Sequence, residues 1–266
     1  MKALFGGLLG VLLVLGLGLA SLFVLQRRLI YFPDPSVPGL PSVDREAGLK
    51  EVFFDSGDGV QLRAWHNPAL PGAATVLILH GNGGHRGGRL DLIRHLLGLQ
   101  LGVFALDYRG YGGSAGTPSE SGLYTDAKAA VDWLESRGFD RLVYFGESLG
   151  TGVAVELALR RPPSKLVLQA PFDSLAAVGA RAYPFLPVDW ILRDRFASLE
   201  KIDRVEASLL ILHGVDDRIV PIAHGRRLFD QAREPKRFIA IEGAGHNDLR
   251  LVGDRFFNPL DDFLVP

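Results

Sequence analysis

The sequence predicts a mostly parallel α/β sheet covered by helices on both faces. Apolar runs with little alternation recur along the chain, which is typical of parallel strands buried on both sides. These runs are 75–79, 102–106, 141–145, 165–169, 208–212 and 237–241. Helical patterns lie between them, at 89–97, 119–136, 149–159 and 222–232. Strands that alternate with helices indicate a doubly wound sheet. The runs 50–54 and 60–66, joined by Ser-Gly-Asp-Gly, predict an antiparallel hairpin at its beginning.

The composition indicates one domain without a nucleic-acid partner. A chain of 266 residues that is 47% hydrophobic is long enough for one well-buried domain and short for two. Its 29 Lys and Arg balance 30 Asp and Glu, so no strong field of either sign favours nucleic acid or another polyanion. The chain has no cysteine, which excludes disulfides, thiolate metal sites and cysteine nucleophiles.

The N-terminus predicts a membrane anchor. Residues 4–25 carry no charge, and 22 helical residues span roughly 33 Å, about the thickness of a bilayer core. The apolar stretch of a cleaved signal peptide is shorter, roughly 7 to 15 residues. We therefore predict a retained single-pass anchor, residues 1–28, that places the protein in a membrane. Lys2 on one side and Arg27 and Arg28 on the other do not determine its orientation.

Two further segments differ from the alternating pattern. Residues 31–41, YFPDPSVPGLP, are rich in Pro and Gly and predict an extended lead-in from the anchor to a catalytic domain of residues 29–266. Residues 172–206 are longer than a simple crossover and contain the aromatic, Pro-rich stretch YPFLPVDW. They predict a small lid inserted into the domain.

One pentapeptide has the context of a nucleophile elbow. Gly146-Glu147-Ser148-Leu149-Gly150 lies between a predicted buried strand and a predicted helix. The serine of such an elbow has a strained backbone at a sharp turn, and glycines two residues away on each side avoid a clash there. Ser148 is therefore the candidate nucleophile. In the alternative interpretation it only caps the helix.

A serine hydroxyl becomes a good nucleophile only beside an imidazole that takes its proton and a carboxylate that orients the imidazole. Both partners are expected on loops after later strands. His246, in a Gly-rich turn after the run 237–241, is the candidate base. Asp216 and Asp217 follow the run 208–212, and the residues alone do not choose between them as the acid.

The loop HGNGG after the run 75–79 supplies a candidate oxyanion hole. The backbone N–H groups of Asn82 and Leu149 are the expected donors. The competing interpretation is a nucleotide-binding loop, but the third glycine of G-x-G-x-x-G is missing and no G-x-x-x-x-G-K-[ST] occurs. Since there is also no His-Glu-x-x-His, we predict no metal and no cofactor.

Taken in order, these motifs resemble the membrane-associated α/β hydrolases of the Bem46 type, which are related to depalmitoylase-like and serine aminopeptidase-like hydrolases. The resemblance rests on the apolar N-terminus with LIYFPDP, then HGNGG, DYRGYGGS, GESLG, APFDSL, HGVDDRIVP and GAGHND. It implies the α/β-hydrolase fold, with Ser148 as nucleophile, His246 as base and Asp217 as acid, and with backbone donors at Asn82 and Leu149. The depalmitoylases have a cysteine-rich N-terminus that this chain lacks, which weakens an assignment to that activity.

The predicted function is hydrolysis of a carboxylic ester or thioester through an acyl-enzyme, with a small-molecule or lipid-like acyl substrate. A serine aminopeptidase is the first alternative, because this fold also hosts peptidases. A peptidase has to hold the free amine of its substrate, and the lid offers Asp189, Asp194 and Glu200 for this. The second alternative is a non-catalytic, membrane-tethered binding protein. The sequence does not define an oligomeric state.

Overall fold

The structure, a computed structural model, describes the backbone of residues 2–265, and in the N-terminal helix the side chains of positions 5, 10, 13, 14 and 16–30. The strands of the main sheet are β2 (Lys50–Asp55), β3 (Gln61–Asn67), β4 (Thr75–Leu79), β6 (Gly102–Asp107), β7 (Leu142–Glu147), β8 (Lys165–Gln169), β9 (Ser208–Gly214) and β10 (Lys236–Ile241). Within residues 2–265 these eight form one sheet in the order β10-β9-β8-β7-β4-β6-β3-β2. Pairing is parallel from β10 to β6, whereas β2 and β3 are antiparallel to their neighbours.

The predicted sheet is therefore confirmed, including the hairpin at its beginning. Strand β4 is buried at all its positions and lies between β6 and β7, as expected from its uninterrupted apolar run. The carboxyl ends of parallel strands meet at one edge of a sheet. As a result, the loops that follow β4, β7, β9 and β10 converge there.

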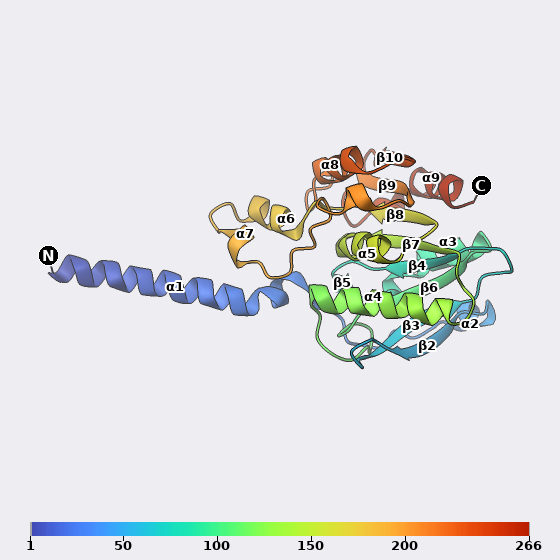
Figure 1. The fold of residues 1–266 in the computed structure, drawn as a ribbon, viewed down its shortest axis with the longest axis horizontal. Helices are drawn as coiled ribbons and strands as arrows, with labels where there is room; N and C mark the ends of the chain where they lie inside the picture. Colours follow the sequence, from blue (N-terminus) through green and yellow to red (C-terminus); the bar gives the residue numbers. More distant parts are fainter. Residues whose placement is uncertain (1, 266) are drawn as a thin grey trace.

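Helices cover both faces of the sheet. They are α3 (Leu90–Gly98), α4 (Glu120–Glu135), α5 (Leu149–Arg160), α8 (Ile222–Gln231) and α9 (Asp254–Leu264), with short 3-10 turns at η1 (Arg86–Arg89), η2 (Ile202–Arg204) and η3 (Leu249–Val252). One core lies under α4, α5 and α8, and α3 and α9 pack over the other core (Figure 1). Helix α9 was not predicted from the sequence, although Phe256, Leu260 and Leu264 recur every four residues and are buried.

A short strand and a small helix follow the N-terminal helix. The predicted lead-in, residues 31–41, begins with β1 (Phe32–Pro33), which pairs in parallel with β5 (Gly83–Gly84) in the loop after β4. The helix α2 (Ser42–Glu46) comes next. The lead-in thus contacts the loop of residues 80–84, the candidate oxyanion loop, as well as joining two parts of the chain.

The segment predicted as a lid, residues 172–206, leaves the sheet after β8. It contains α6 (Leu175–Ala182) and α7 (Val188–Ile191), and the side chain of Ser174 caps α6 by accepting a hydrogen bond from the Ala177 N–H at 3.0 Å. Phe185 and Trp190 are 96% and 90% exposed. We refer to residues 172–206 as the lid segment.

Helix α1 (Lys2–Ile30) extends away from the globular part, and its C-terminal turns adjoin the lid segment at α7 (Figure 1). The uncharged run in the sequence predicts a transmembrane anchor here. Among the helices in the described part of the chain, none is long and apolar enough to cross a membrane, so the structure does not support that prediction. Part of the uncharged run 4–25 lies outside the described side chains. The helix also continues past the predicted boundary at residue 28.

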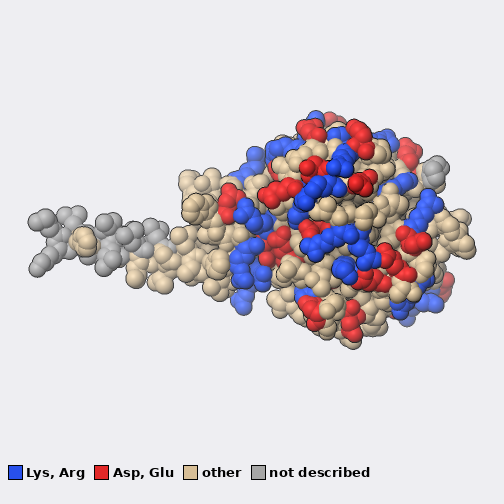
Figure 2. Space-filling view, in the orientation of Figure 1, with Lys and Arg blue, Asp and Glu red and all other residues tan. Residues whose placement is uncertain are grey.

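Charged side chains of both signs are interspersed over the visible face of the globular part (Figure 2). This distribution agrees with the nearly equal numbers of acidic and basic residues. Other charges are paired at short range inside the fold, such as the buried Arg109 with Asp126, and Arg109 also pairs with the exposed Asp58.

The aromatic packing of β6 gives a test of the core. Phe104 is fully buried and contacts Phe54 and Trp133, so Phe104→Ala should lower the free energy of unfolding by about 3–5 kcal/mol in urea denaturation. Phe53→Ala is the matched control, because Phe53 is 50% exposed, and should lower it by less than about 1 kcal/mol. Equal losses in the two variants would contradict the assignment of this core.

Candidate active site

Ser148 lies at the sharp turn between β7 and α5. Its backbone has φ 50° and ψ −114°, a left-handed conformation that only a forced turn imposes on serine. A Cβ at Gly150 would lie 2.0 Å from the Leu79 carbonyl oxygen, and one at Gly146 would lie 2.7 Å from that of Gly150. Both glycines are therefore required by close packing. The Ser148 side chain makes no capping hydrogen bond to α5, so the alternative interpretation as a helix cap is wrong.

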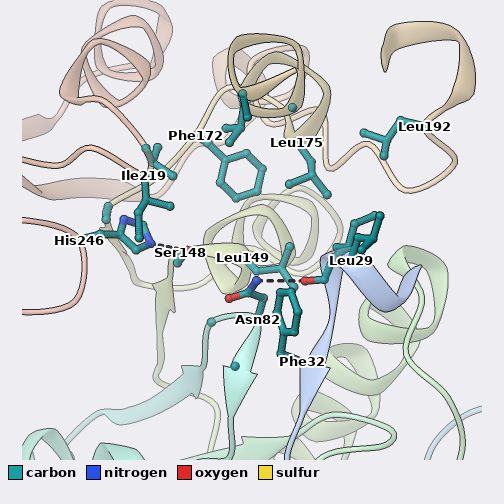
Figure 3. Close-up of a pocket in the computed structure, with 18 of the residues that line it drawn as sticks. Leu29, Phe32, Asn82, Ser148, Leu149, Phe172, Leu175, Leu192, Ile219 and His246 are labelled. Atoms are coloured by element: carbon teal, nitrogen blue, oxygen red, sulfur yellow. Dashed lines mark hydrogen bonds between the residues drawn. The ribbon is translucent and has the colours of Figure 1, made fainter. Parts of the chain in front are cut away.

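The structure brings His246 and Asp217 to this turn from the loops after β10 and β9. His246 Nε2 lies 2.8 Å from Ser148 Oγ (Figure 3), and His246 Nδ1 lies 2.7 Å from Asp217 Oδ2. Asp217 is buried, whereas Asp216 is exposed. The carboxylate that reaches the imidazole is thus the one that the family resemblance implied.

The second oxygen of Asp217 is held by its own loop. Asp217 Oδ1 accepts hydrogen bonds from the N–H groups of Ile219 and Val220, at 2.9 and 2.8 Å. Burial by itself raises the pKa of this carboxyl, but hydrogen bonds from His213 and His246 outweigh it, so the pKa lies well below its usual range. Asp217 therefore stays ionised near neutral pH and favours the imidazole tautomer with hydrogen on Nδ1.

The predicted oxyanion donors lie on both sides of Ser148. Leu149 begins α5, so its N–H has no partner within the helix, and Asn82 lies in the loop after β4. Among the described residues, neither of the two backbone N–H groups has a hydrogen-bond partner. Both donors are therefore available to a developing negative charge.

A cavity of about 740 Å³ is lined by Ser148 and His246. Its volume falls in the range of ligand pockets, roughly 300–1,000 Å³. Figure 3 shows Phe172, Leu175 and Leu192 of the lid segment on one side, and Leu29 and Phe32 of the N-terminal segment on another. The cavity is thus mainly apolar, with its polar groups at Ser148 and around it.

Comparisons with known proteins identify the family. Residues 71–196 match the family model described as serine aminopeptidase, S33. The chain is 31% identical to the α/β-hydrolase domain-containing protein WAV2 of Arabidopsis thaliana, over 96% of this chain and 91% of that protein. The chain belongs to the α/β-hydrolase family.

Other members of the α/β-hydrolase family are also similar. An uncharacterized protein of Mycobacterium tuberculosis is 47% identical over 86% of this chain and 83% of its own length. The lysophosphatidylserine lipase ABHD12 of Mus musculus is 39% identical over 71% of this chain and 53% of its own length. The Pyrococcus furiosus esterase Pf2001 has the same fold, with a TM-score of 0.74 over 88% of this chain and 97% of that chain, at 21% identity. These matches confirm the predicted fold and the prediction that this α/β-hydrolase is an enzyme.

An ionic cluster that was not predicted from the sequence lies directly before the candidate nucleophile. Glu147 accepts hydrogen bonds from Arg89 at 2.7 and 3.2 Å and from Arg250 at 2.9 Å, and Arg250 also pairs with Asp91 at 2.9 Å. These partners are far from Glu147 in sequence, so no local pattern signals them. Through these ion pairs, Glu147 connects the turn at Ser148 to Arg89 in the loop after β4 and to Arg250 in the loop after β10.

This α/β-hydrolase has no metal centre in its described part: no group of three or more His, Asp or Glu residues there is arranged to hold a metal ion. The carboxylates near the cavity are instead paired with basic side chains through hydrogen bonds. Besides Asp217 and Glu147, these include Asp173, which pairs with His224 and Arg227.

The lowered pKa of Glu147 predicts that the folded protein is less stable at acidic pH. Burial alone raises its pKa, but the charges of Arg89 and Arg250 outweigh burial and lower the pKa to about 2, from 4.5. A lowered folded-state pKa adds stability above the unfolded-state pKa and loses it as pH falls through the folded-state value. The free energy of unfolding should therefore decrease by about 3 kcal/mol between about pH 5 and pH 2.

The measurement is urea denaturation across this pH range for the wild type and for Glu147→Gln. The variant should be less stable at pH 7, because two arginines lose their partner, and its stability should depend less on pH. Glu46→Gln, at an exposed site without an ion pair among the described residues, should keep the wild-type pH dependence. A Glu147→Gln variant with the wild-type pH dependence would contradict the role of this cluster.

Proposed function

We propose that the protein is a serine hydrolase that cleaves carboxylic esters or thioesters of apolar acyl groups. The observation that carries this proposal is the pair of hydrogen bonds that joins Ser148 Oγ to His246 and His246 to Asp217, beside an apolar cavity. A hydroxyl, an imidazole and a buried carboxylate in this order form an activated nucleophile. Relatives named as a lipase and as an esterase support the same reaction class.

In the proposed mechanism, Ser148 Oγ attacks the acyl carbon while His246 Nε2 takes its proton. The N–H groups of Asn82 and Leu149 stabilise the tetrahedral oxyanion, and the N-terminal end of α5 adds a favourable dipole. His246 then protonates the leaving alcohol or thiol, and the acyl-enzyme forms. A water molecule that gives its proton to His246 releases the acid and restores Ser148.

The cavity favours a lipid-like acyl chain over a short polar one. Its lining is mostly aliphatic and aromatic, and burial of each CH2 group there stabilises the complex by about 0.8 kcal/mol. The relative named as a lysophosphatidylserine lipase indicates that a single-chain lipid ester is a suitable first substrate to test. We therefore propose medium-chain and long-chain monoacyl esters as the substrate class.

The peptidase alternative receives less support from the lid segment. Of its three candidate carboxylates, none lines the cavity. Asp194 is buried against Arg27, and Asp189 and Glu200 are exposed. A free amine in the cavity would therefore meet no available carboxylate from this segment. The non-catalytic alternative is also weaker, because all three side chains of the proposed triad are present and hydrogen-bonded to one another.

A fluorophosphonate probe tests the proposed nucleophile. We expect a covalent adduct on Ser148, mapped by mass spectrometry of the full chain, since the probe reacts with activated serines. The adduct should be absent in Ser148→Ala and slowed at least about a hundredfold in His246→Ala. Thr151→Ala is a control with a hydroxyl removed one turn into α5, and should still be labelled. Labelling of Ser148→Ala at the wild-type rate would remove Ser148 from the mechanism.

The choice of acid gives a second test. Asp217→Asn preserves the shape of the side chain but favours the wrong imidazole tautomer, so kcat on a p-nitrophenyl ester should fall by about 10³–10⁴. Asp216→Asn changes the exposed neighbouring carboxylate and should leave kcat within about twofold. Thermal denaturation of both variants controls for folding. The assignment fails if Asp216→Asn shows the larger loss.

A further inference from the structure

The N-terminal segment contacts two parts of the site that lie far from it in sequence. We define the strap as residues 22–34, which include the last turns of α1 and strand β1. The strap lies outside the segment that matches the family model, residues 71–196. It nevertheless reaches the lid segment on one side and the oxyanion loop on the other.

A partly buried ion pair joins the strap to the lid segment. Arg27 donates two hydrogen bonds to the carboxylate of Asp194, at 2.8 and 3.0 Å, and the Tyr31 hydroxyl donates a third at 3.0 Å. Asp194 and Tyr31 are each only 3% exposed. A buried carboxylate depends on all its partners, because water cannot replace them. The part of the lid segment that follows α7 is thus fixed to α1.

The neighbouring residue in α1, Gln26, makes a second pair of hydrogen bonds to the lid segment. The side chain of Gln26, which is 7% exposed, donates to the Ile191 carbonyl at 3.0 Å and accepts from the Arg193 N–H at 2.7 Å. One amide therefore satisfies two backbone groups of the lid segment where α7 ends. These contacts fix the position of α7 relative to α1.

The strap also holds the oxyanion loop. The Phe32 N–H donates to the Asn82 carbonyl at 2.9 Å, and Asn82 Nδ2 donates to the Ile30 carbonyl at 3.0 Å, the dashed line at Asn82 in Figure 3. The Tyr111 hydroxyl donates to the same Asn82 carbonyl at 2.9 Å. The carbonyl and the side chain of Asn82 are thereby held by the strap and Tyr111, next to the Asn82 N–H proposed to bind the oxyanion.

Between these two attachments, the strap forms a wall of the cavity. Leu22, Leu29, Ile30 and Phe32 line it, and Figure 3 shows Leu29 and Phe32 near Leu149. Leu29 and Phe32 are 62% and 54% exposed. An acyl chain that leaves Ser148 along this wall would cover them and gain the burial free energy.

We propose that the strap is a specificity element: it forms the wall against which a medium or long acyl chain binds, and it positions the lid segment and the oxyanion loop around that chain. This inference rests on the proposed esterase function and adds to it. It assigns chain-length selectivity to residues outside the family segment and assigns Arg27 and Asn82 positioning roles.

The first experiment changes the attachment to the lid segment. In the purified full chain, Arg27→Ala should lower kcat/KM for a p-nitrophenyl decanoate at least about tenfold and that for the acetate less than about threefold, because the acetyl group is too short to use the wall. Arg28→Ala is the matched control: Arg28 is exposed and forms no ion pair among the described residues, so both esters should be unaffected.

A second variant changes the wall without disturbing the ion pair. Leu29→Trp places an indole in the cavity from an exposed position that folding tolerates. We expect the decanoate to lose at least about tenfold in kcat/KM and the acetate to change by less than about threefold. If Arg27→Ala does not fold, Leu29→Trp alone decides the result. The proposal is overturned if both esters are affected equally or if neither is affected.

A third variant tests whether the bond between Asn82 and the strap positions the oxyanion loop without contributing to substrate binding. Asn82→Ala keeps the backbone N–H but removes the bond to Ile30, so kcat should fall about tenfold for both esters while KM stays constant. An unchanged kcat would overturn the positioning role. Failure of the proposed function itself is distinct, because the wild type would then neither hydrolyse an ester nor react with fluorophosphonate at Ser148.

Discussion

At Ser148 the backbone turns with φ 50° between β7 and α5, and the rest of the site is arranged around that turn. The turn is forced by close packing: Gly146 and Gly150 leave no room for a Cβ, and Leu79 of β4 closes the space beside them. Such strain persists only where the surrounding structure imposes it. Here the imposing structure is the buried parallel sheet, whose strands fix both ends of the turn.

Charges around the turn stabilise it further. Glu147 and its two arginines connect the loops after β4, β7 and β10, so three loops that meet at one edge of the sheet share one ionic cluster. Asp217 is held by hydrogen bonds from two backbone N–H groups of its own loop. Polar groups that are fully paired in a buried setting specify one arrangement, because each alternative leaves a group without a partner. The hydrogen bonds of Ser148, His246 and Asp217 are thus preorganised.

The strap joins the N-terminal helix to this arrangement. Without Arg27 and Gln26 the lid segment would have fewer fixed contacts, and without Phe32 the Asn82 loop would lose its neighbouring strand. The cavity therefore depends on a segment that precedes the sheet in the sequence. In this protein the proposed acyl site is built from the N-terminus, the lid segment and the strand ends together.

Much of the fold was predictable from the sequence because its signals are local. The buried strands appear as uninterrupted apolar runs, and the elbow appears as five consecutive residues between a strand and a helix. The order of the motifs was enough to predict the α/β-hydrolase fold and to select Ser148, His246 and one of two adjacent aspartates as candidates. The membrane anchor was also inferred from a local run of apolar residues, but such a run does not specify how its helix contacts the domain.

The sequence by itself thus determined the sheet, the strained turn and the identity of the loops that carry the candidate residues. The tertiary structure decided which aspartate is buried against His246, which arginines pair with Glu147, and how α1 meets the lid segment. These contacts join groups far apart in the chain, as with Arg27 and Asp194 at a separation of 167 positions. Their geometry depends on packing of the whole fold, whereas a strand or a sharp turn depends on a few neighbouring residues.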